Sequence, residues 1–342
     1  RENIELKRGE VASTDMLGDS AAFRVLKTQL DKVTKSNGRV MLTGPAGSGK
    51  EIAARYIHAN SNRAGGPFVT VSSASIEPDR MEEVLFGREG GSRGVEKGLL
   101  EEANGGVIYF EEIADMPLGT QSKILRVLVD QRFQRVGGNE KVQVDLRVIS
   151  STNRDLSAAI EAGTFREELY HRLNVVPIPV PSLEERREDI PLLAEYFIGM
   201  FNKNQGLPLR KLAEDARALL QTMLWPGNVR QLKNVVERVL ILGENSDEIA
   251  AKELPASDEA SAVDEGRIVL SGGLATLPLR EARELFEREY LLTQINRFGG
   301  NISRTASFVG MERSALHRKL KSLGVATTNK AGSRVAYVES ET

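Results

Sequence analysis

A glycine-rich segment, GPAGSGKE at residues 44–51, is the feature that most constrains how this chain can fold. It comes directly after the apolar run RVMLT at 39–43 and directly before the helical pattern IAARYIHA at 52–59. A loop that opens onto a helix N-terminus presents backbone N–H groups and the positive end of the helix dipole, and both favour a bound phosphate. The segment therefore predicts a phosphate-binding loop, with a functionless glycine-rich turn as the alternative.

The residue types inside this segment fit a phosphate-binding loop. Gly44, Gly47 and Gly49 allow the backbone to curl and to approach a phosphate closely, and Lys50 can reach the outer phosphates of a nucleotide. Glu51 stands where such loops usually carry a Ser or Thr that holds Mg²⁺. We expect the nucleotide to contact the whole segment, which consists of Gly44, Pro45, Ala46, Gly47, Ser48, Gly49, Lys50 and Glu51.

Short β-branched runs alternate with helix-length segments through the first half of the chain. Runs that are apolar on both faces and separated in this way predict a parallel sheet buried between helices, which is an α/β fold. The runs lie at 39–43, 67–71, 106–110, 146–151 and 175–180. From about residue 185 the strand patterns stop. A helical apolar stripe at Leu232, Val235, Val236, Val239 and Leu240 then indicates a helical subdomain.

Polar residues end two of the expected strands. Glu111 and Glu112 follow the run at 106–110, and Asn153 follows the run at 146–151. The carboxyl edge of a parallel sheet is where a nucleotide's Mg²⁺ and the attacking water lie, so we expect the pair Glu111 and Glu112 to serve the metal and the water, with acids that merely end a strand as the alternative. Asn153 is then a candidate to sense the γ-phosphate or to position the water. For Asn153, an ordinary polar strand end is the alternative.

Two arginines further along are candidates to reach the nucleotide of a neighbouring subunit. Arg166 and Arg172 lie six residues apart in the segment FREELYHR. Arginine fingers supplied in trans stabilise the charge that develops during phosphoryl transfer. A pair of solvated surface arginines is the alternative interpretation.

Composition excludes several other kinds of chemistry. The chain has no Cys and only three His, so disulfides, thiol nucleophiles and His- or Cys-based metal sites are not expected. No apolar run approaches the roughly 18 residues that cross a bilayer, and we see no signal peptide. We therefore expect a soluble cytoplasmic protein without a membrane partner.

The near-neutral total charge hides an asymmetry near the C-terminus. Residues 243–266 carry eight acids and one base without hydrophobic periodicity, which is typical of a solvated linker. Residues 301–334 carry seven Lys or Arg and one acid, Glu312. A small basic unit behind an acidic tether is the pattern expected of a nucleic-acid-binding domain.

The basic unit has the pattern of a helix-turn-helix. A helix over 281–297, the pair Gly299–Gly300, a short helix reaching Gly310 and a second helix beyond it are expected, with Leu316 and Leu320 facing inward. We expect Arg318 to read a guanine edge and Ser303, Arg304 and Lys319 to contact phosphates. The full set of expected DNA-binding residues is Ser303, Arg304, Arg313, Ser314, His317, Arg318, Lys319 and Lys321. A small packing domain with a solvated charged face is the alternative.

These features together resemble a known family. The chain from about 13 to 242 resembles the AAA+ domain of bacterial enhancer-binding proteins, which remodel RNA polymerase bound to sigma-54, and residues 281–324 resemble a Fis-type helix-turn-helix. The whole is most similar to the NtrX group of the NtrC family of response regulators. The stretches that carry the resemblance are MLGDSAAFR, GPAGSGKE, LFGRE, GLLEEANGG, FREELYHRLNVVPIPVPSLEERREDIPLL and WPGNVRQLKNVVER.

The resemblance implies roles for several residues. Leu17 and Gly18 match the segment that borders the adenine, and Arg230 matches the second sensor. The chain would bind ATP or ADP with Mg²⁺, using the loop at 44–51, and would have Glu111, Glu112 and Asn153 as its hydrolytic residues and Arg166 and Arg172 as its fingers. The partners implied are double-stranded DNA with a palindromic operator, RNA polymerase, a second copy in a homodimer or hexameric ring, and a sensor histidine kinase.

The sequence departs from the family pattern at three places. Residues 90–97 read GGSRGVEK where the family has the GAFTGA loop that contacts sigma-54. Glu111 replaces the metal-binding Asp, and its extra methylene displaces the carboxylate by more than an ångström, which can cost about 100-fold in rate. Ser72 stands where the family has an Asn that restrains the catalytic Glu. We expect ATP binding with weak or absent hydrolysis.

The expected organisation has six segments and supports one leading function. The segments are a linker from a missing receiver domain at 1–12, an α/β subdomain at 13–184, a helical lid at 185–242, an acidic linker at 243–278, a helix-turn-helix at 279–325 and a tail at 326–342.

The leading interpretation is a transcription regulator that acts independently of sigma-54. A working sigma-54 activator ATPase and an AAA+ remodeller of DNA-associated proteins are the alternatives.

Overall fold

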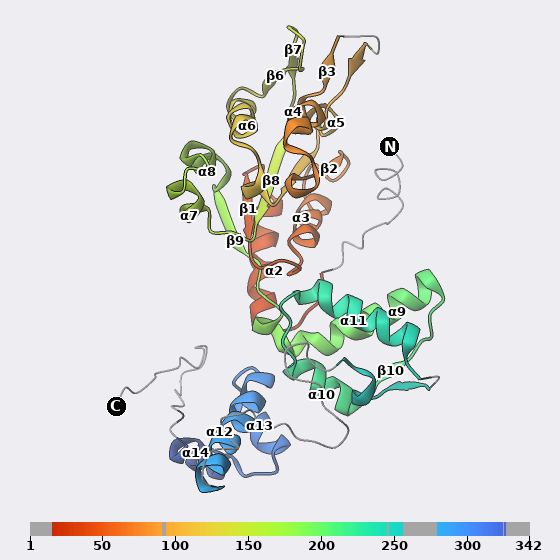
Figure 1. Cartoon of the computed structure of the whole chain (residues 1–342), viewed down its shortest axis with the longest axis vertical. Helices are drawn as coiled ribbons and strands as arrows, with labels where there is room; N and C mark the ends of the chain where they lie inside the picture. The colour runs from red at the N-terminus through yellow and green to blue at the C-terminus, as the bar shows by residue number, and fades with distance from the viewer. Residues whose placement is uncertain (1–15, 91–93, 245, 256–278, 324, 326–342) are drawn as a thin grey trace. The chain divides into compact units, whose positions relative to one another are not determined.

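The structure is a computed structural model that describes residues 16–90, 94–244, 246–255, 279–323 and 325 (Figure 1). The chain divides into two compact units. The described part of the first comprises residues up to Ser182 together with Gly227–Arg230, and the second comprises the rest. The expected terminal segments 1–12 and 326–342 lie outside the described residues.

A parallel five-stranded sheet forms the centre of the first unit, with strand order β2-β5-β8-β1-β9. Its strands are β1 (Val40–Thr43), β2 (Phe68–Ser72), β5 (Val107–Glu111), β8 (Arg147–Thr152) and β9 (Val176–Pro179). Each lies on one of the five apolar runs, so the α/β prediction is confirmed. The three inner strands are almost entirely buried, whereas β2 and β9, at the edges, are partly open.

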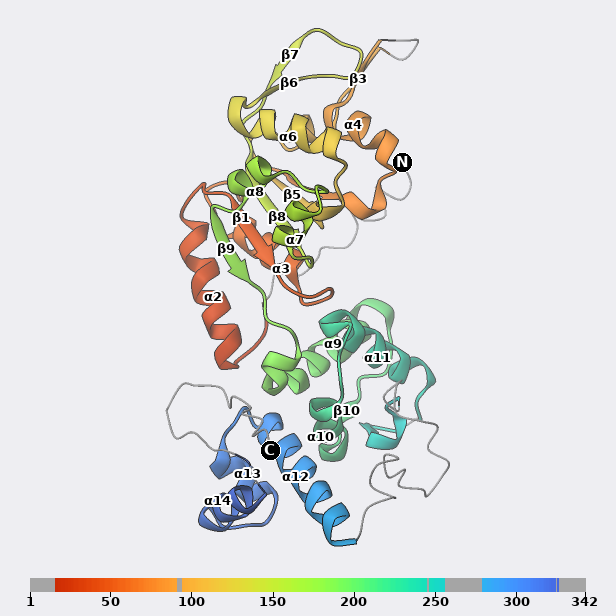
Figure 2. The same ribbon diagram turned by 60° about the vertical axis from the view of Figure 1, so that its left-hand side comes forward.

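Helices cover both faces of this sheet (Figures 1 and 2). One face packs against α2 (Ala21–Thr34) and α3 (Lys50–Ala59) through Leu30, Ile57 and their neighbours. The other face packs against α4 (Pro78–Phe86), α6 (Leu118–Asp130), α7 (Leu156–Glu161) and α8 (Glu167–Leu173). Alternate residues of one strand belong to opposite cores, Tyr109 to the first and Phe110 to the second, because side chains alternate along a strand.

Two short hairpins extend this unit beyond the sheet, and the sequence patterns did not predict them. They are β3 (Arg88–Glu89) with β4 (Val95–Glu96), and β6 (Arg132–Gln134) with β7 (Lys141–Gln143). Strands of two or three residues are too short to produce a visible alternation of polar and apolar residues. The four-residue helix α5 (Leu99–Glu102) follows β4.

The second unit begins with the predicted helical lid. It contains α9 (Ile190–Gln205), α10 (Glu214–Thr222) and most of α11 (Asn228–Leu242). Of the expected stripe on α11, Leu232, Val236, Val239 and Leu240 are buried, whereas Val235 is only half-buried. The expectation that no strand follows residue 185 was wrong. The two-residue strands β10 (Lys211–Leu212) and β11 (Glu248–Ile249) pair in parallel.

The acidic segment after residue 242 is more ordered than a solvated linker. Ile249 and Leu254 are buried, and the carboxylate of Glu253 pairs with the Arg210 guanidinium at 2.9 Å. Both charged side chains are almost fully buried. Residues 246–255 therefore belong to the lid, and a linker can begin only after them. The charge count over residues 243–266 did not reveal this packing, because a count of acidic residues treats a buried, paired carboxylate in the same way as a solvated one.

In the C-terminal part of the second unit, the described residues 279–323 form the helices α12 (Leu279–Arg297), α13 (Ile302–Phe308) and α14 (Arg313–Ser322). Asn301 caps α13 by accepting the backbone N–H of Arg304 at 3.2 Å. Leu316 and Leu320 are fully buried against Leu291, Ile295 and Ala306. The predicted helix-turn-helix arrangement is confirmed.

Candidate functional site

The glycine-rich loop joins the carboxyl end of β1 to the first turn of α3, as its sequence predicts. Gly44, Gly47 and Gly49 all have positive φ angles. At Gly44 a Cβ would lie 2.4 Å from the carbonyl oxygen of Val180, so no side chain fits there. Gly49, in the left-handed region, is the N-cap of α3, and therefore the amide groups that begin this helix are free of a side-chain cap. This geometry suits an anion.

Lys50 points back over this loop. Its Nζ donates to the carbonyl oxygens of Gly44 at 2.9 Å and Pro45 at 3.2 Å, and it lies 3.2 Å from Glu112 Oε1. The Lys50 side chain is only 7% exposed. The cation is therefore held in the loop where outer phosphates would meet it.

Glu112 is fixed between two of the predicted site residues. Its Oε1 faces Lys50, and its Oε2 accepts the backbone N–H of Asn153 at 2.8 Å. Its backbone has φ 50°, which is left-handed and unfavourable for a residue with a side chain. Strained backbone of this kind is concentrated at functional sites. The structure thus brings together Lys50, Glu112 and Asn153 from three different elements.

Glu111 ends β5 directly beside Glu112 and is half-buried. Within the described ranges, no group of three His, Asp or Glu side chains could hold a metal by itself. Mg²⁺ commonly uses one or two carboxylates together with nucleotide phosphates and waters. A single carboxylate such as Glu111 is compatible with that mode of binding.

Glu51 is held by a residue that the motif did not indicate. Arg55, one helical turn later, donates Nε and Nη2 to Glu51 Oε1 at 3.0 and 2.7 Å. The Arg55 guanidinium also lies 4.7 Å from the centre of the Phe68 ring. The spacing of four residues between acid and base could have suggested this pair. Both of these bonds are made to Oε1 of Glu51.

Asn228 is a second contributor that the sequence analysis missed. Its side-chain amide donates to the carbonyl oxygen of Ala46 at 2.9 Å, and its φ is 50°. Asn tolerates left-handed backbone better than most residues, so the sequence Pro226–Gly227–Asn228 could have suggested a tight turn with a special role for Asn228. Two residues later, the backbone N–H of Arg230 lies 3.4 Å from the carbonyl oxygen of Gly47. The backbone of Arg230 therefore lies beside the loop.

A buried hydroxyl pair lies behind the acidic residues. Tyr109 Oη and Ser151 Oγ are 2.8 Å apart, and they join β5 to β8 two residues before Glu111 and Asn153. Burial raises the pKa of Tyr109, as do the negative charges of Glu111, Glu51 and Glu112, although its bond to Ser151 acts in the opposite direction. Tyr109 is therefore neutral, and it links the two strands that carry the site.

The remaining predicted residues lie at exposed positions or in the N-terminal segment. Arg166 is the N-cap of α8, and its Nε donates to the Leu118 carbonyl oxygen at 3.3 Å; Arg172 lies in the last turn of the same helix. Both side chains are exposed, as a group that reaches a neighbouring subunit must be. Leu17 and Gly18 are half-buried in the segment before α2.

The segment 88–97 forms the hairpin β3–β4. It is joined to the second hairpin region by two backbone bonds of 2.9 Å, from Glu89 N to Val136 O and from Val136 N to Gly87 O. Arg135 adds a bond across this junction to Glu89 of β3 at 3.4 Å, and it forms a bidentate pair with Glu101 of α5 at 2.8 and 2.9 Å. The pKa of Arg135 is raised by its bonds to Glu101 and Glu89. Residues 91–93, between β3 and β4 in the sequence, lie outside the described residues.

In the described part of the chain, Ser72 makes no hydrogen bond to Glu112. Its hydroxyl lies 3.0 Å from the hydroxyl of Ser75, while Glu112 is restrained by Lys50 and the Asn153 backbone. The amide contact that the family's Asn makes has no counterpart at Ser72 in the described structure.

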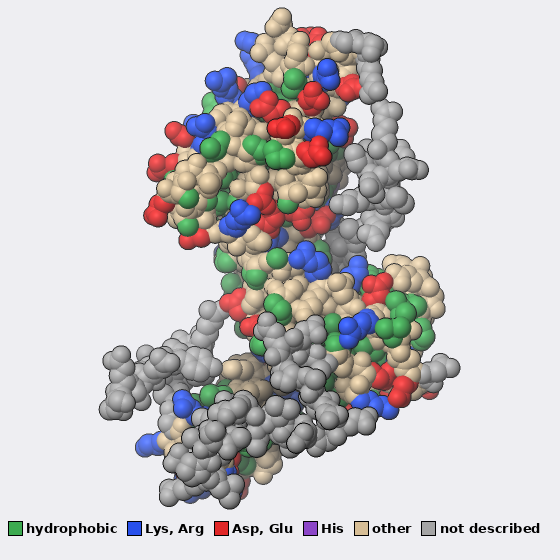
Figure 3. Space-filling model, viewed as in Figure 1, with side chains coloured by type: hydrophobic (Ala, Val, Ile, Leu, Met, Phe, Trp, Pro, Cys, Tyr) green, Lys and Arg blue, Asp and Glu red, His purple; other side chains and the backbone are tan. Residues whose placement is uncertain are grey.

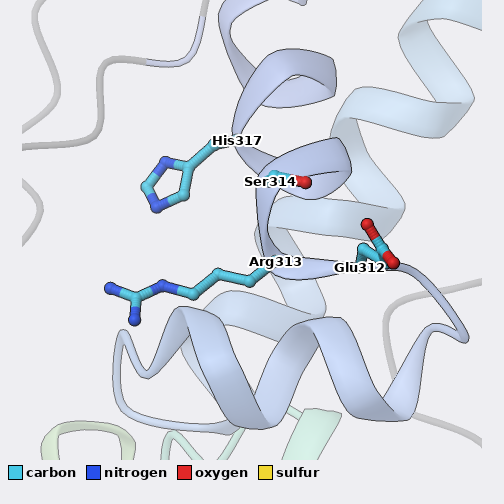
Figure 4. Close-up of a pocket in the computed structure, with 4 residues that line it drawn as sticks. All are labelled: Glu312, Arg313, Ser314 and His317. Carbon is cyan, nitrogen blue, oxygen red and sulfur yellow. The ribbon is translucent and has the colours of Figure 1, made fainter.

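Most of the predicted DNA-binding residues are exposed on α13 and α14. The exposed set consists of Ser303, Arg304, Arg313, Ser314, Arg318 and Lys321, and His317 is half-buried. Glu312, Arg313, Ser314 and His317 line a hollow at the start of α14 (Figure 4). A second helix of a helix-turn-helix reads bases mainly with its N-terminal residues, and this hollow lies there.

Lys319 differs from the other basic residues of α14. Its Nζ pairs with Glu287 on α12, and Glu287 also pairs with Arg283 at 3.0 Å. These two cations lower the pKa of Glu287. Lys319 therefore links two helices within the domain, and its charge is partly compensated before any phosphate approaches.

Surface charge elsewhere does not suggest a competing nucleic-acid surface on the face that Figure 3 shows. Acidic and basic side chains are intermixed over the visible part of the sheet-containing unit (Figure 3).

No helix in the described parts of the chain has the length and apolar character needed to cross a membrane.

Comparisons with known proteins agree with this architecture. Residues 16–179 match the family model described as the sigma-54 interaction domain, residues 184–268 match the AAA+ ATPase lid domain, and residues 282–323 match the Fis family of bacterial regulatory proteins. The order and extent of the three matches follow the two parts of the AAA+ module and the helix-turn-helix.

Individual relatives align over almost the whole chain. The nitrogen assimilation regulatory protein NtrX of Azorhizobium caulinodans is 56% identical over 95% of this chain and 72% of its own length. The transcriptional regulator NtrC of Salmonella typhimurium is 36% identical over 92% and 71%. Crystal structures of NtrX from Brucella abortus in complex with ADP and with ATP are 54% identical and superpose with a TM-score of 0.81, covering 95% of this chain and 73% of theirs.

Proposed function

The chain belongs to the NtrX group of the NtrC family of response regulators, and from that premise we propose that it regulates transcription by occupying DNA without contacting sigma-54. Its helix-turn-helix binds a palindromic operator as a homodimer. ATP in the AAA+ module tunes the oligomeric state and does not drive remodelling of the polymerase.

The hairpin β3–β4 is the single observation that carries this proposal. Between Gly87 and Gly98 there is no Phe and no Thr, and the connection between its two-residue strands spans only residues 90–94. A surface that lacks its contact residues has no differential affinity for sigma-54 between nucleotide states. The nucleotide cycle can remodel a partner only if the affinity of the protein for that partner differs between nucleotide states.

Nucleotide binding is supported by the loop at 44–51 and its neighbours. The Brucella relative has been crystallised with ADP and with ATP, and this chain has Lys50 in its loop with Asn228 and Arg230 against it. We propose that Lys50 meets the outer phosphates and that Glu111 holds Mg²⁺ together with the nucleotide. The metal supplies charge neutralisation for the phosphates.

We propose that hydrolysis is weak or absent. Glu111 is one methylene longer than the Asp of the family pattern, and Ser72 cannot supply the amide contact that restrains the catalytic acid. Glu112 and Asn153 are in contact, so the residues that would position water are present. Arg166 and Arg172 would complete such a site only from a neighbouring subunit in a ring.

A sigma-54-dependent activator is the second candidate, and the match to the sigma-54 interaction domain over residues 16–179 favours it. In that case another segment would have to replace the missing contact loop. RNA polymerase would then be a direct partner. In both cases a sensor histidine kinase is the proposed upstream partner, because response regulators are controlled by such kinases.

Transcription in vitro separates the two candidates. Purified polymerase carrying either sigma-54 or the housekeeping sigma factor is mixed with the protein, ATP and promoter DNA. We expect a change in transcription that follows operator occupancy and persists with a non-hydrolysable ATP analogue. Open complexes that form only with sigma-54 and hydrolysable ATP would establish the second candidate.

A further inference from the structure

An acidic residue stands at the start of the helix that enters the DNA. Glu312 is the N-cap of α14, and it precedes the cations Arg313, Arg318, Lys319 and Lys321 of that helix. It is the one acid among the residues from Asn301 to Ser322. A carboxylate on a surface that approaches phosphates weakens binding, so its presence there calls for a compensating role.

Ordinary structural roles do not use this carboxylate. The Glu312 side chain makes no cap hydrogen bond to the first turn of α14. Among the described residues, no ion pair or side-chain hydrogen bond involves Glu312, although Arg313 is its neighbour, and the side chain is exposed. A favourable interaction with the helix dipole remains, but it does not occupy the carboxylate oxygens with a hydrogen bond. The acceptor oxygens are therefore available to a ligand.

The start of α14 separates hydrogen-bond donors from acceptors. In Figure 4 the side chains of Arg313 and His317 extend to the same side of the helix, whereas the Glu312 carboxylate lies on the other flank, where the Ser314 hydroxyl points. All four residues line the same hollow. One flank thus presents cationic or imidazole N–H groups, and the other presents an anionic acceptor.

A G·C base pair has the complementary arrangement in the major groove. Guanine exposes the acceptors N7 and O6, and cytosine exposes the donor N4–H₂. Arg is suited to the guanine edge, and Glu accepts from cytosine N4. N-terminal residues of the second helix are those that reach base edges in this motif.

We propose that Glu312 is a specificity-determining residue that accepts a hydrogen bond from cytosine N4 in each operator half-site, beside Arg313 on guanine. The proposal rests on the proposed DNA-binding function and deepens it. Glu312 discriminates between base sequences because it gains a hydrogen bond only where a cytosine amino group faces it. At other sequences its negative charge still repels the phosphates, and no hydrogen bond offsets that repulsion.

The test is selection from a random duplex library with the full chain. The preferred sequence is first determined for the unaltered protein, and binding of the selected duplex and of a scrambled duplex of equal length is then measured. The same measurements are made for Glu312→Ala and Glu312→Gln. Glu284→Ala, which removes an equal charge from an exposed position on α12, is the matched control.

We expect Glu312→Ala to reduce discrimination at one C·G position of each half-site by about five- to tenfold while binding to the scrambled duplex becomes tighter or is unchanged. Glu312→Gln should broaden that position to include adenine, since Gln recognises adenine N6 and N7. Glu284→Ala should leave the base preference unchanged.

Three results would overturn the proposal. The first is an equal gain in affinity for both duplexes with an unchanged preferred sequence, which would make Glu312 a source of repulsion only. The second is lower thermal stability with unchanged preference, which would make it a helix-dipole residue only. The third is the absence of any sequence preference in the unaltered protein, which would instead remove the proposed DNA-binding function itself.

Discussion

The carboxylate of Glu112 lies 3.2 Å from the ammonium group of Lys50, and its second oxygen accepts the Asn153 backbone N–H at 2.8 Å. The cation that would meet the outer phosphates is therefore paired with the acid that would polarise water. We expect a phosphate to compete with Glu112 for the same ammonium group, so that nucleotide binding weakens this ion pair.

Replacing Lys50 with Ala should lower the affinity for ATP at least tenfold, about 1.4 kcal/mol, because the charge that neutralises the outer phosphates is lost. Isothermal titration calorimetry measures the effect. Lys27→Ala, on the exposed side of α2, is a control that removes an equal charge. Unchanged ATP binding by the Lys50 variant would show that the phosphate-loop assignment is wrong.

Glu112→Gln should have the opposite effect on binding. The amide no longer competes for Lys50 as an anion, so ATP should bind several-fold more tightly, and any hydrolysis should cease because a neutral amide cannot act as a base. Binding is measured by calorimetry and turnover by phosphate release. Weaker ATP binding in this variant would mean that Glu112 supports the loop and does not compete with the nucleotide.

Shortening the metal-binding acid should raise turnover. If the extra methylene of Glu111 misplaces the carboxylate, Glu111→Asp should increase the hydrolysis rate by at least tenfold, since misplacement by about an ångström can cost 100-fold. ATP affinity should change little. A phosphate-release assay at saturating ATP and Mg²⁺ decides the matter, and an unchanged or lower rate contradicts the explanation for weak hydrolysis.

Arg318 and Lys319 should behave differently although they are adjacent. Arg318→Ala should cost about 1–3 kcal/mol on the selected site and relax its base preference. Lys319→Ala should weaken all duplexes about equally, and it should also lower the unfolding temperature, because Lys319 pairs with Glu287 on α12. Binding titrations at several salt concentrations, together with thermal unfolding, distinguish the two. Identical behaviour on selected and scrambled duplexes would mean that the recognition face is assigned wrongly.

The pair Arg210–Glu253 makes lid stability depend on pH. The Arg210 guanidinium, with the backbone N–H groups of Ala250 and Glu244, lowers the pKa of Glu253 from 4.5 to about 2. A lowered carboxyl pKa contributes stability that is full above the unfolded value and is lost as the pH falls toward the folded value. Glu253→Gln should therefore destabilise the lid at pH 7, and its difference from the unaltered protein should shrink between pH 4.5 and pH 2. Urea midpoints measured across that range test this, and a difference independent of pH would contradict it.

Local patterns in the sequence were sufficient to predict the loop at 44–51, the strands of the sheet and the helix-turn-helix. The glycines of the loop at 44–51 stand where the backbone has positive φ angles, which Gly adopts easily. The five apolar runs indicate buried strands because strands of a parallel sheet covered by helices are apolar on both faces. The buried pair Leu316 and Leu320 likewise followed from helical spacing. These patterns depend on residues within a few positions of one another, and the hydrophobic effect selects the same local structure in almost any context.

Tertiary structure alone decided the contacts between distant segments. The strand order β2-β5-β8-β1-β9, the bond from Asn228 to Ala46 across 182 positions and the pairing of β10 with β11 have no local signal. The same holds for the pair Lys50–Glu112, whose members are brought together only when β5 and the loop after β1 share one edge of the sheet. Such contacts follow from chain connections and packing of the whole unit, because two-residue strands and single hydrogen bonds are too weak to specify themselves.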